Sequence, residues 1–140
     1  MDEKKIVEEL IAKHETNNPF VITDNLGITL LYRSMRNTLG FFSKYKRFRF
    51  IHLNDNLPEH LKAFVCAHEL AHAVMHADIN TPFLKSCTLF STDKIEREAN
   101  IFAVELLLPD RLLQDYADCS MFHIAKAVGI PEKLVQLKHK

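Results

Sequence analysis

The chain has 140 residues, of which 47% are hydrophobic, and it carries 18 basic and 18 acidic side chains. A chain of this size buries about two-thirds of its unfolded surface, so we expect a single domain over residues 1–140. The balanced charge argues against a protein that coats nucleic acid with its whole surface, although a local patch is compatible with it.

No apolar run approaches the ~20 residues of a membrane-spanning helix, and the charged N-terminus does not resemble a signal peptide. The three cysteines, Cys66, Cys87 and Cys119, are widely separated. This spacing favours reduced thiols over a disulfide framework or a cysteine-based zinc site, and we interpret Cys66 and Cys119 as small core residues. We therefore expect a soluble cytoplasmic protein without membrane contacts.

The first part of the chain predicts a helix and a small sheet. Residues 2–15 place their apolar side chains on one helical stripe, and Asn17–Pro19 interrupts it. A short element and a turn follow over 20–28. Three β-rich runs then predict an antiparallel or mixed sheet. These predicted strands are residues 28–32, 39–43 and 47–53.

The remainder of the chain predicts helices. A helix begins near Pro58 and continues to about His76, and a loop over 83–91 leads to a second core helix. The expected fold class is α+β: a small sheet, two core helices and a helical C-terminal subregion over 118–140. The predicted helices after the loop are residues 93–108 and 109–116, one that starts at Ser120, and a last one between Gly129 and Lys138.

A metal-binding pattern lies in the predicted helix 58–76. His68, Glu69 and His72 form the arrangement H-E-x-x-H. Residues four positions apart project from one helical face, so both imidazoles can bind one ion, and their nitrogens suit Zn²⁺. Glu69 points near the same face, where it can take a proton from a water molecule at the metal. Apolar neighbours predict that this part of the helix is buried, where a glutamate needs a partner.

A third protein ligand is required if one zinc position stays open for water. His76 continues the histidine ladder, but it lies about 12 Å from His68 along the helix axis, so we expect it to cap the helix C-terminus. Glu96 and Glu98 lie on the next predicted helix and face directions about 160° apart, so only one of them can reach the metal.

We favour Glu96 over Glu98 as the third ligand. Glu96 shares a helical face with small residues and with Asn100, which can orient a ligand histidine. Glu98 is the alternative ligand, and otherwise we expect it to be solvated or paired with Arg97 or Lys94. The structural alternative for Glu96 is a capping box with the preceding Asp93.

Two motifs together carry a resemblance to a known family. The first is A-H-E-L-A-H over 67–72, followed by His76, and the second is E-x-E-A-N-x-F-A-x-x-L-L-L-P over 96–109. In this order and separation they resemble the ImmA/IrrE metallopeptidase family. A weaker likeness covers most of residues 19–131, and Ala71 stands where the family often has glycine.

The resemblance implies a compact zincin-like domain in which His68, His72 and Glu96 hold Zn²⁺ and Glu69 is the general base. Members of this family are cytoplasmic proteases, often encoded on prophages or conjugative elements, that cleave a helix-turn-helix repressor. We therefore expect a zinc-dependent endopeptidase that acts on a repressor-type transcription regulator. The alternative is a metal-stabilised protein- or DNA-binding module without protease activity.

Three further features leave alternatives open. Residues 124–135 have helix–turn–helix spacing, but with few basic residues we expect them to complete the core rather than contact DNA. The basic and aromatic run over 44–49 is interpreted as a solvated strand face, with a docking surface for an acidic partner as the alternative. An oxyanion in the reaction would need a further donor, and the sequence does not choose among four candidates: Tyr32, Tyr45, Tyr116 and His123.

Overall fold

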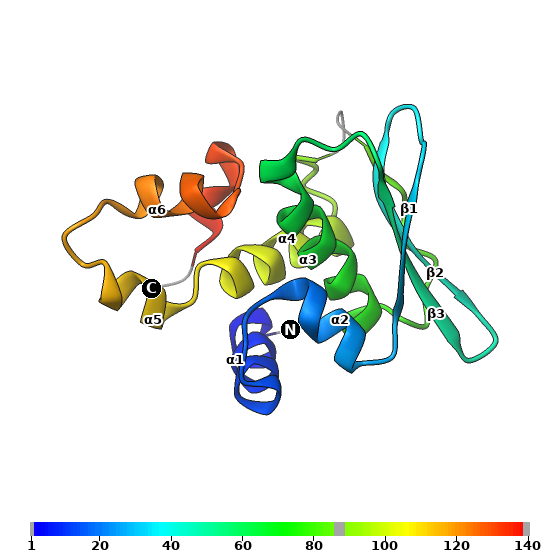
Figure 1. Ribbon diagram of the computed structural model, residues 1–140, viewed down its shortest axis with the longest axis horizontal. Helices are drawn as coiled ribbons and strands as arrows, with labels where there is room; N and C mark the ends of the chain where they lie inside the picture. Colours follow the sequence, from blue (N-terminus) through cyan, green and yellow to red (C-terminus); the bar gives the residue numbers. More distant parts are fainter. Residues whose placement is uncertain (1, 86–88, 139–140) are drawn as a thin grey trace.

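The computed structural model describes residues 2–85 and 89–138. It is an α+β fold in which a sheet forms one side, α3 and α4 lie in the middle, and the C-terminal helices form the other side (Figure 1). The helices are α1 (Glu3–His14), α2 (Pro19–Asn25), α3 (Glu59–Met75), α4 (Lys94–Leu107), α5 (Asp110–Asp115), α6 (Met121–Val128) and the 3₁₀ helix η2 (Glu132–Leu137). The strands are β1 (Thr29–Arg33), β2 (Thr38–Tyr45), β3 (Phe48–Asn54) and β4 (Leu84–Lys85).

The sheet is mixed, which is one of the two forms that the sequence analysis allowed. Its strand order is β1-β3-β2-β4, with β1 parallel to β3 and β2 antiparallel to both β3 and β4. A tight turn joins β2 to β3, and Lys46 adopts a positive φ of 55° there. The prediction of a loop over 83–91 missed β4, because two residues are too few to show a strand period; residues 86–88 lie outside the described part.

One face of the sheet packs closely on α3. Gly40 on β2 makes this approach possible, since a β-carbon there would lie 2.8 Å from Val65 Cγ1 and 2.9 Å from the carbonyl oxygen of His52. Phe42 and Ile51 are buried in the same core. The contact fixes α3 against the sheet, so the helix that carries H-E-x-x-H has a rigid support.

The helices α3 and α4 form the centre of the molecule. Residues Phe64–Ala73 of α3 and Ala99–Leu107 of α4 are buried along their whole length. Small side chains at Ala67, Ala71 and Ala103 are fully buried and permit the two helices to lie close together. This packing brings acidic side chains of α4 next to histidines of α3.

The C-terminal elements pack on the core, as predicted. Gly129 ends α6 with φ 91°, and a β-carbon there would lie 2.0 Å from the carbonyl oxygen of His60, so the turn lies directly on the first turn of α3. The last element is the 3₁₀ helix η2, which packs on the core through the buried side chains of Leu134 and Val135.

The predictions for the cysteines have three outcomes. Cys66 is buried, as predicted, and hydrogen-bonds through its sulfur with Thr23 Oγ1 at 3.8 Å. The prediction that Cys119 belongs to the core was wrong, because it lies exposed in the connection before α6. Cys87 lies outside the described residues. Within the described part of the chain, no helix has the length and apolar character needed to cross a membrane.

Candidate metal centre

Three side chains from two helices converge between α3 and α4. His68 and His72 lie one turn apart on α3, and Glu96 lies in the first turn of α4. Glu96 Oε1 is 2.8 Å from His72 Nε2 and 3.4 Å from His68 Nε2. One ligand atom from each residue lies within 4.8 Å of the others, and all three residues are buried. The arrangement offers two nitrogens and a carboxylate to a single ion.

Asn100 determines which nitrogen of His68 carries a proton. The Asn100 side-chain amide donates from Nδ2 to the carbonyl oxygen of Leu89 at 2.9 Å, so its Oδ1 faces His68 Nδ1 at 2.8 Å. An amide oxygen only accepts, and therefore His68 donates from Nδ1. In the neutral ring, Nε2 then carries a lone pair directed at Glu96. This contact is the basis on which Asn100 can orient the ring of His68, the role predicted for it.

A second relay determines the same property of His72. His72 Nδ1 is 3.0 Å from His76 Nδ1, and His76 Nε2 is 2.9 Å from Glu98 Oε1. A carboxylate accepts the proton of His76 Nε2, so His76 Nδ1 accepts from His72 Nδ1. The Nε2 lone pair of His72 therefore also points at Glu96. Carboxylate–histidine relays of this kind hold metal-binding imidazoles in position.

The electrostatics of this group call for a positive charge. Two nitrogen lone pairs and a carboxylate oxygen would repel one another at these distances unless a proton or a cation lay among them. Burial opposes the charge on Glu96, but where the histidines carry a proton on Nε2, hydrogen bonds from His68 and His72 outweigh burial and lower the pKa of Glu96 to about 2. Burial also disfavours charge on both histidines. Contact with Glu96 overcomes this at His68, whose pKa is raised, but not at His72, whose pKa is lowered.

Glu69 lies beside this group and is fully buried. Both of its carboxylate oxygens lack a hydrogen-bond partner among the described residues, as do His68 Nε2 and Glu96 Oε2. Burial raises the pKa of Glu69 to about 8; charge on His68 opposes this shift and Glu96 adds to it. Buried polar atoms normally find partners, so four such atoms at one point indicate a functional site.

Two sequence-based expectations for this region need correction. Glu98 was expected to be solvated or paired with Arg97 or Lys94, but its side chain is only 14% exposed and it pairs with His76. The capping-box alternative for Glu96 also does not hold, because Asp93 makes no side-chain capping bond. The structure thus gives the two acids different positions, with Glu96 at the histidine pair and Glu98 behind it.

His76 makes contacts that the sequence analysis did not anticipate. It is the C-cap residue of α3, as expected, and its backbone N–H donates to the carbonyl oxygen of His72. Its side chain also connects His72 to Glu98, which the sequence did not predict. The available signal was the four-residue spacing of His68, His72 and His76 together with a second acid two residues after Glu96.

The four candidates for an oxyanion donor all have exposed side chains. Tyr32 and Tyr45 are exposed on the sheet, Tyr116 is exposed at the end of α5, and His123 is exposed on α6. None of the described hydrogen bonds joins them to the histidines or to Glu96. The structure therefore does not bring any of these four into the centre.

Comparison with known proteins defines the class. Residues 23–139 match the model of a peptidase family described as the IrrE N-terminal-like domain. The chain is 43% identical over 138 residues to uncharacterized immunity region protein 2 of Bacillus phage phi105. This alignment covers 96% of this chain and 87% of that protein. It is 36% identical over 114 residues to metallopeptidase ImmA of Bacillus subtilis (strain 168). This alignment covers 80% of this chain and 66% of that protein.

These matches extend over nearly the whole chain, including both helices of the histidine and glutamate group. The chain belongs to the ImmA/IrrE family of metallopeptidases.

Proposed function

We propose that the protein is a zinc-dependent endopeptidase in which His68, His72 and Glu96 hold the ion and Glu69 is the general base. The observation that carries this proposal is the convergence of two imidazole lone pairs and an ionised carboxylate at one buried point. Two nitrogens and one carboxylate oxygen are the ligand set of catalytic zinc sites that leave one position for water. The family match supports the metal as part of the activity.

The residues present fit a zinc ion. Asn100 holds the ring of His68, and the His76–Glu98 pair holds the ring of His72, so both Nε2 atoms are oriented before any ion binds. Such preorganisation increases metal affinity because little side-chain freedom is lost on binding. The unpartnered atoms His68 Nε2 and Glu96 Oε2 would gain a partner.

Zinc supplies Lewis acidity to the scissile carbonyl group and makes water a nucleophile at neutral pH. The positive charge of a bound ion would lower the pKa of Glu69 from its raised value, so that Glu69 would take the proton of the attacking water on one of its free oxygens. It then passes this proton to the amine nitrogen as the C–N bond breaks, so water is divided between the two products. Glu69 is fully buried, which keeps bulk water from competing for that proton.

The names of the relatives bear on the substrate. One relative is named for a phage immunity region and another is named metallopeptidase ImmA. From this we infer a protein substrate, a helix-turn-helix repressor encoded near this protein, and a reaction in the cytoplasm where such a repressor acts. The C-terminal elements pack on α3 and α4, which supports a role in the fold rather than in DNA binding.

The test combines cleavage with metal analysis. Purified protein is incubated with zinc and the regulator encoded beside it, and mass spectrometry is used to search for a single cut. We expect Glu69→Gln to keep its zinc and to lose about a hundredfold to ten-thousandfold in kcat/KM, the usual contribution of a general base. Glu59→Gln is the matched control, because Glu59 lies on the same helix with an exposed side chain.

Full cleavage by Glu69→Gln would remove Glu69 from the mechanism. Zinc binding without cleavage of any supplied regulator by the unaltered protein would favour the alternative, a metal-stabilised binding module.

A further inference from the structure

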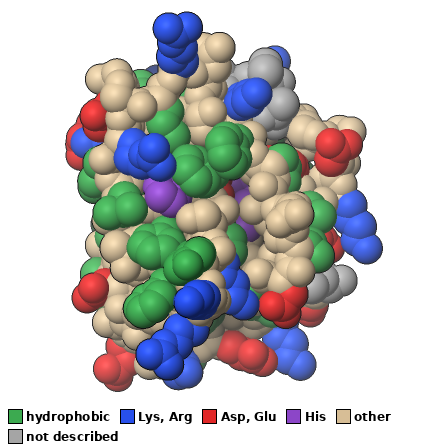
Figure 2. All heavy atoms as spheres, turned by 90° about the vertical axis from the view of Figure 1, so that its right-hand side faces the viewer, with side chains coloured by type: hydrophobic (Ala, Val, Ile, Leu, Met, Phe, Trp, Pro, Cys, Tyr) green, Lys and Arg blue, Asp and Glu red, His purple; other side chains and the backbone are tan. Residues whose placement is uncertain are grey.

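None of the described helices covers the face of the sheet opposite α3 (Figure 1). Gly40 and Phe42 of β2 face α3, and side chains alternate along a strand, so the residues between and after them face outward. Figure 2 views this side of the molecule and shows hydrophobic side chains gathered around histidine, with Lys and Arg side chains among and below them. We call this surface the outer sheet face; it comprises Phe41, Ser43 and Tyr45 and their cross-strand partners His52, Phe50 and Phe48.

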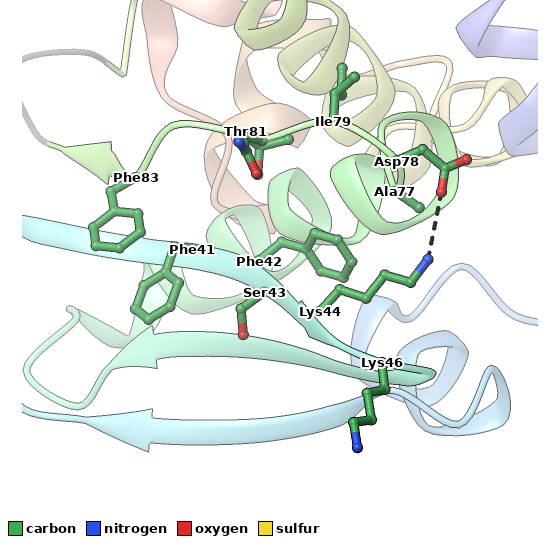
Figure 3. A pocket seen from close by; sticks show the side chains of 11 residues that line it. Phe41, Phe42, Ser43, Lys44, Lys46, Ala77, Asp78, Ile79, Thr81 and Phe83 are labelled. Carbon is green, nitrogen blue, oxygen red and sulfur yellow. Dashed lines mark ion pairs between the residues drawn. The ribbon is translucent and has the colours of Figure 1, made fainter.

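Aromatic rings dominate the outer sheet face. Phe41 stacks on His52, with ring centroids 4.0 Å apart, and on Phe83 of the neighbouring loop at 4.2 Å (Figure 3). Tyr45 and Phe48 stand at the other end of the same strands, about 13 Å away by strand geometry. Tyr45 is 67% exposed, Phe48 is 56% exposed and Phe83 is 50% exposed. Exposed rings gathered on one face mark an interaction site.

A cation accompanies each group of rings. The guanidinium carbon of Arg33 lies 6.0 Å from the ring centre of Phe41. Around the tight turn, Lys46 Nζ lies 5.5 Å from the ring centre of Tyr45, and the guanidinium carbon of Arg47 lies 5.8 Å from that of Phe48. The flat rings and the positive charges are therefore intermixed.

The charge of this segment differs from that of the whole chain. Residues 29–54 contain six Lys and Arg side chains and no Asp or Glu, although the chain as a whole is neutral. Lys44 is engaged on the helix side by Asp78, as Figure 3 shows, and Arg49 donates to the carbonyl oxygen of Leu26. In the described part of the chain no carboxylate pairs with Arg33, Lys46 or Arg47.

We propose that the outer sheet face binds single-stranded nucleic acid. Bases stack on the exposed rings of Tyr45 and Phe48, and Phe83 extends the stacking surface at the other end. Arg33, Lys46 and Arg47 contact the phosphates. Rings that alternate with cations on an open sheet provide both interactions that an unpaired strand needs, because stacking needs only the face of a base.

The same features disfavour the other anionic partners. A duplex has its bases stacked internally, so the rings would have no base face to contact. An acidic peptide would use the cations but leave the rings without a specific role. The sequence pattern alone favoured a solvated strand here, and the gathering of the rings on one uncovered face changes that interpretation. The site lies across the sheet from α3, so it does not depend on the proposed peptidase activity.

The test is a fluorescence anisotropy titration in which the full-length protein is added to a labelled oligonucleotide of about fifteen deoxythymidine nucleotides at about 50 mM salt. Stacking contributes about five- to 150-fold in affinity per base, so we expect Phe48→Ala and Tyr45→Ala each to weaken binding within this range. Phe122→Ala is the matched control, since Phe122 is also 56% exposed but lies on α6. We expect this control and Glu69→Gln to bind as the unaltered protein does.

The charge component is tested by salt dependence. Each phosphate contact adds about 0.7 to the slope of log affinity against log salt for a single strand, so Lys46→Glu and Arg47→Glu should each flatten that slope. Arg111→Glu on α5 is the control and should leave the slope unchanged. Phe48→Leu keeps the apolar bulk at this position but removes the flat ring, so it tests stacking without the risk of poor folding that Phe48→Ala carries. We expect Phe48→Leu to bind the oligonucleotide as weakly as Phe48→Ala.

Four outcomes would overturn the proposal. They are no binding at low salt, equal losses in Phe48→Ala and Phe122→Ala, equal affinity for a duplex of the same length, and tighter binding of polyglutamate than of the oligonucleotide. The last outcome would identify an acidic protein segment as the partner instead.

Discussion

Two buried polar clusters lie along α4, and they differ in how completely their atoms are paired. At the C-terminal end, Lys138 Nζ lies 2.7 Å from Glu105 Oε1 and 2.9 Å from Asp110 Oδ1, and Lys4 reaches the other oxygen of Asp110 at 2.9 Å. At the N-terminal end, Glu96 meets two histidines, and four atoms in and beside this group have no hydrogen-bond partner among the described residues.

The difference separates a cluster that is complete by itself from one that could hold a metal ion. A buried charge that serves only the fold needs an opposite charge, because desolvation costs several kcal/mol otherwise. The Glu105 cluster satisfies this requirement and ties η2 to α4. The histidine cluster leaves acceptors facing one another, an arrangement that needs a proton or a cation among them. The following predictions test whether the two clusters behave in these different ways.

The largest effect on stability is expected at the paired cluster. Glu105→Ala leaves the buried ammonium of Lys138 with only the half-exposed Asp110, and we expect the free energy of unfolding to fall by about 3–5 kcal/mol. Urea denaturation with and without zinc measures this, and the loss should be the same in both. The double variant Glu105→Leu with Lys138→Met should recover most of it. A loss below about 1 kcal/mol would show that this cluster adds little to the fold.

The next effect concerns the histidine cluster and depends on zinc. At a zinc concentration of 100 times Kd, the unaltered protein should gain about 2.7 kcal/mol in stability from binding alone. Glu96→Gln keeps the shape but removes the anionic ligand, so this gain should largely disappear. Thermal unfolding with zinc and with chelator compares the two proteins. An equal zinc-dependent gain in Glu96→Gln would exclude Glu96 as a ligand, and Glu98→Gln then becomes the variant to test.

A smaller effect is expected from Asn100, which positions His68. Asn100→Ala removes the acceptor of His68 Nδ1, and we expect zinc affinity to fall by about ten- to a hundredfold. Competition with a chromophoric chelator measures the affinity. Asn100→Asp restores an acceptor at the same place and should recover binding. If the alanine and aspartate variants lose affinity equally, the contact does not orient the histidine.

The smallest effect is a pH dependence of the paired cluster. Hydrogen bonds from Lys138 and Lys4 lower the pKa of Asp110 below its ordinary 3.8. The stabilisation is therefore present above pH 3.8 and is lost as the pH falls through the lower folded value. Asp110→Asn should cost about 0.2–1 kcal/mol at pH 7, because the carboxylate is partly exposed, and the difference from the unaltered protein should vanish in acid. A difference that persists in strong acid would assign the effect to packing.

The parts of the site that local periodicity governs could be predicted from the sequence. Residues four positions apart on a helix share a face whatever surrounds them, so His68 and His72 had to project together. The same reasoning separated Glu96 from Glu98 by direction. It did not say which direction led to α3, and the preference for Glu96 depended on the small residues beside it.

Contacts between distant segments could not be predicted in the same way. Glu98 approaches His76 across 22 residues of sequence, and Lys138 approaches Glu105 across 33. Each pairing depends on how α3, α4 and η2 pack, and no pattern within one element encodes that geometry. The strand β4 was missed for a related reason, since its two residues become a strand only through pairing with β2.

The sequence by itself determined most of the helices and strands and the residues able to bind a metal, because turn and pleat periods are short-range properties of the chain; α2 was predicted only as a short element. Only the tertiary structure decided which of these residues meet, which buried charges are paired and which remain unpaired. It also decided which face of the sheet stays open to solvent. The physical reason is that burial and pairing depend on the whole packed core, in which a side chain's neighbours come from distant parts of the chain.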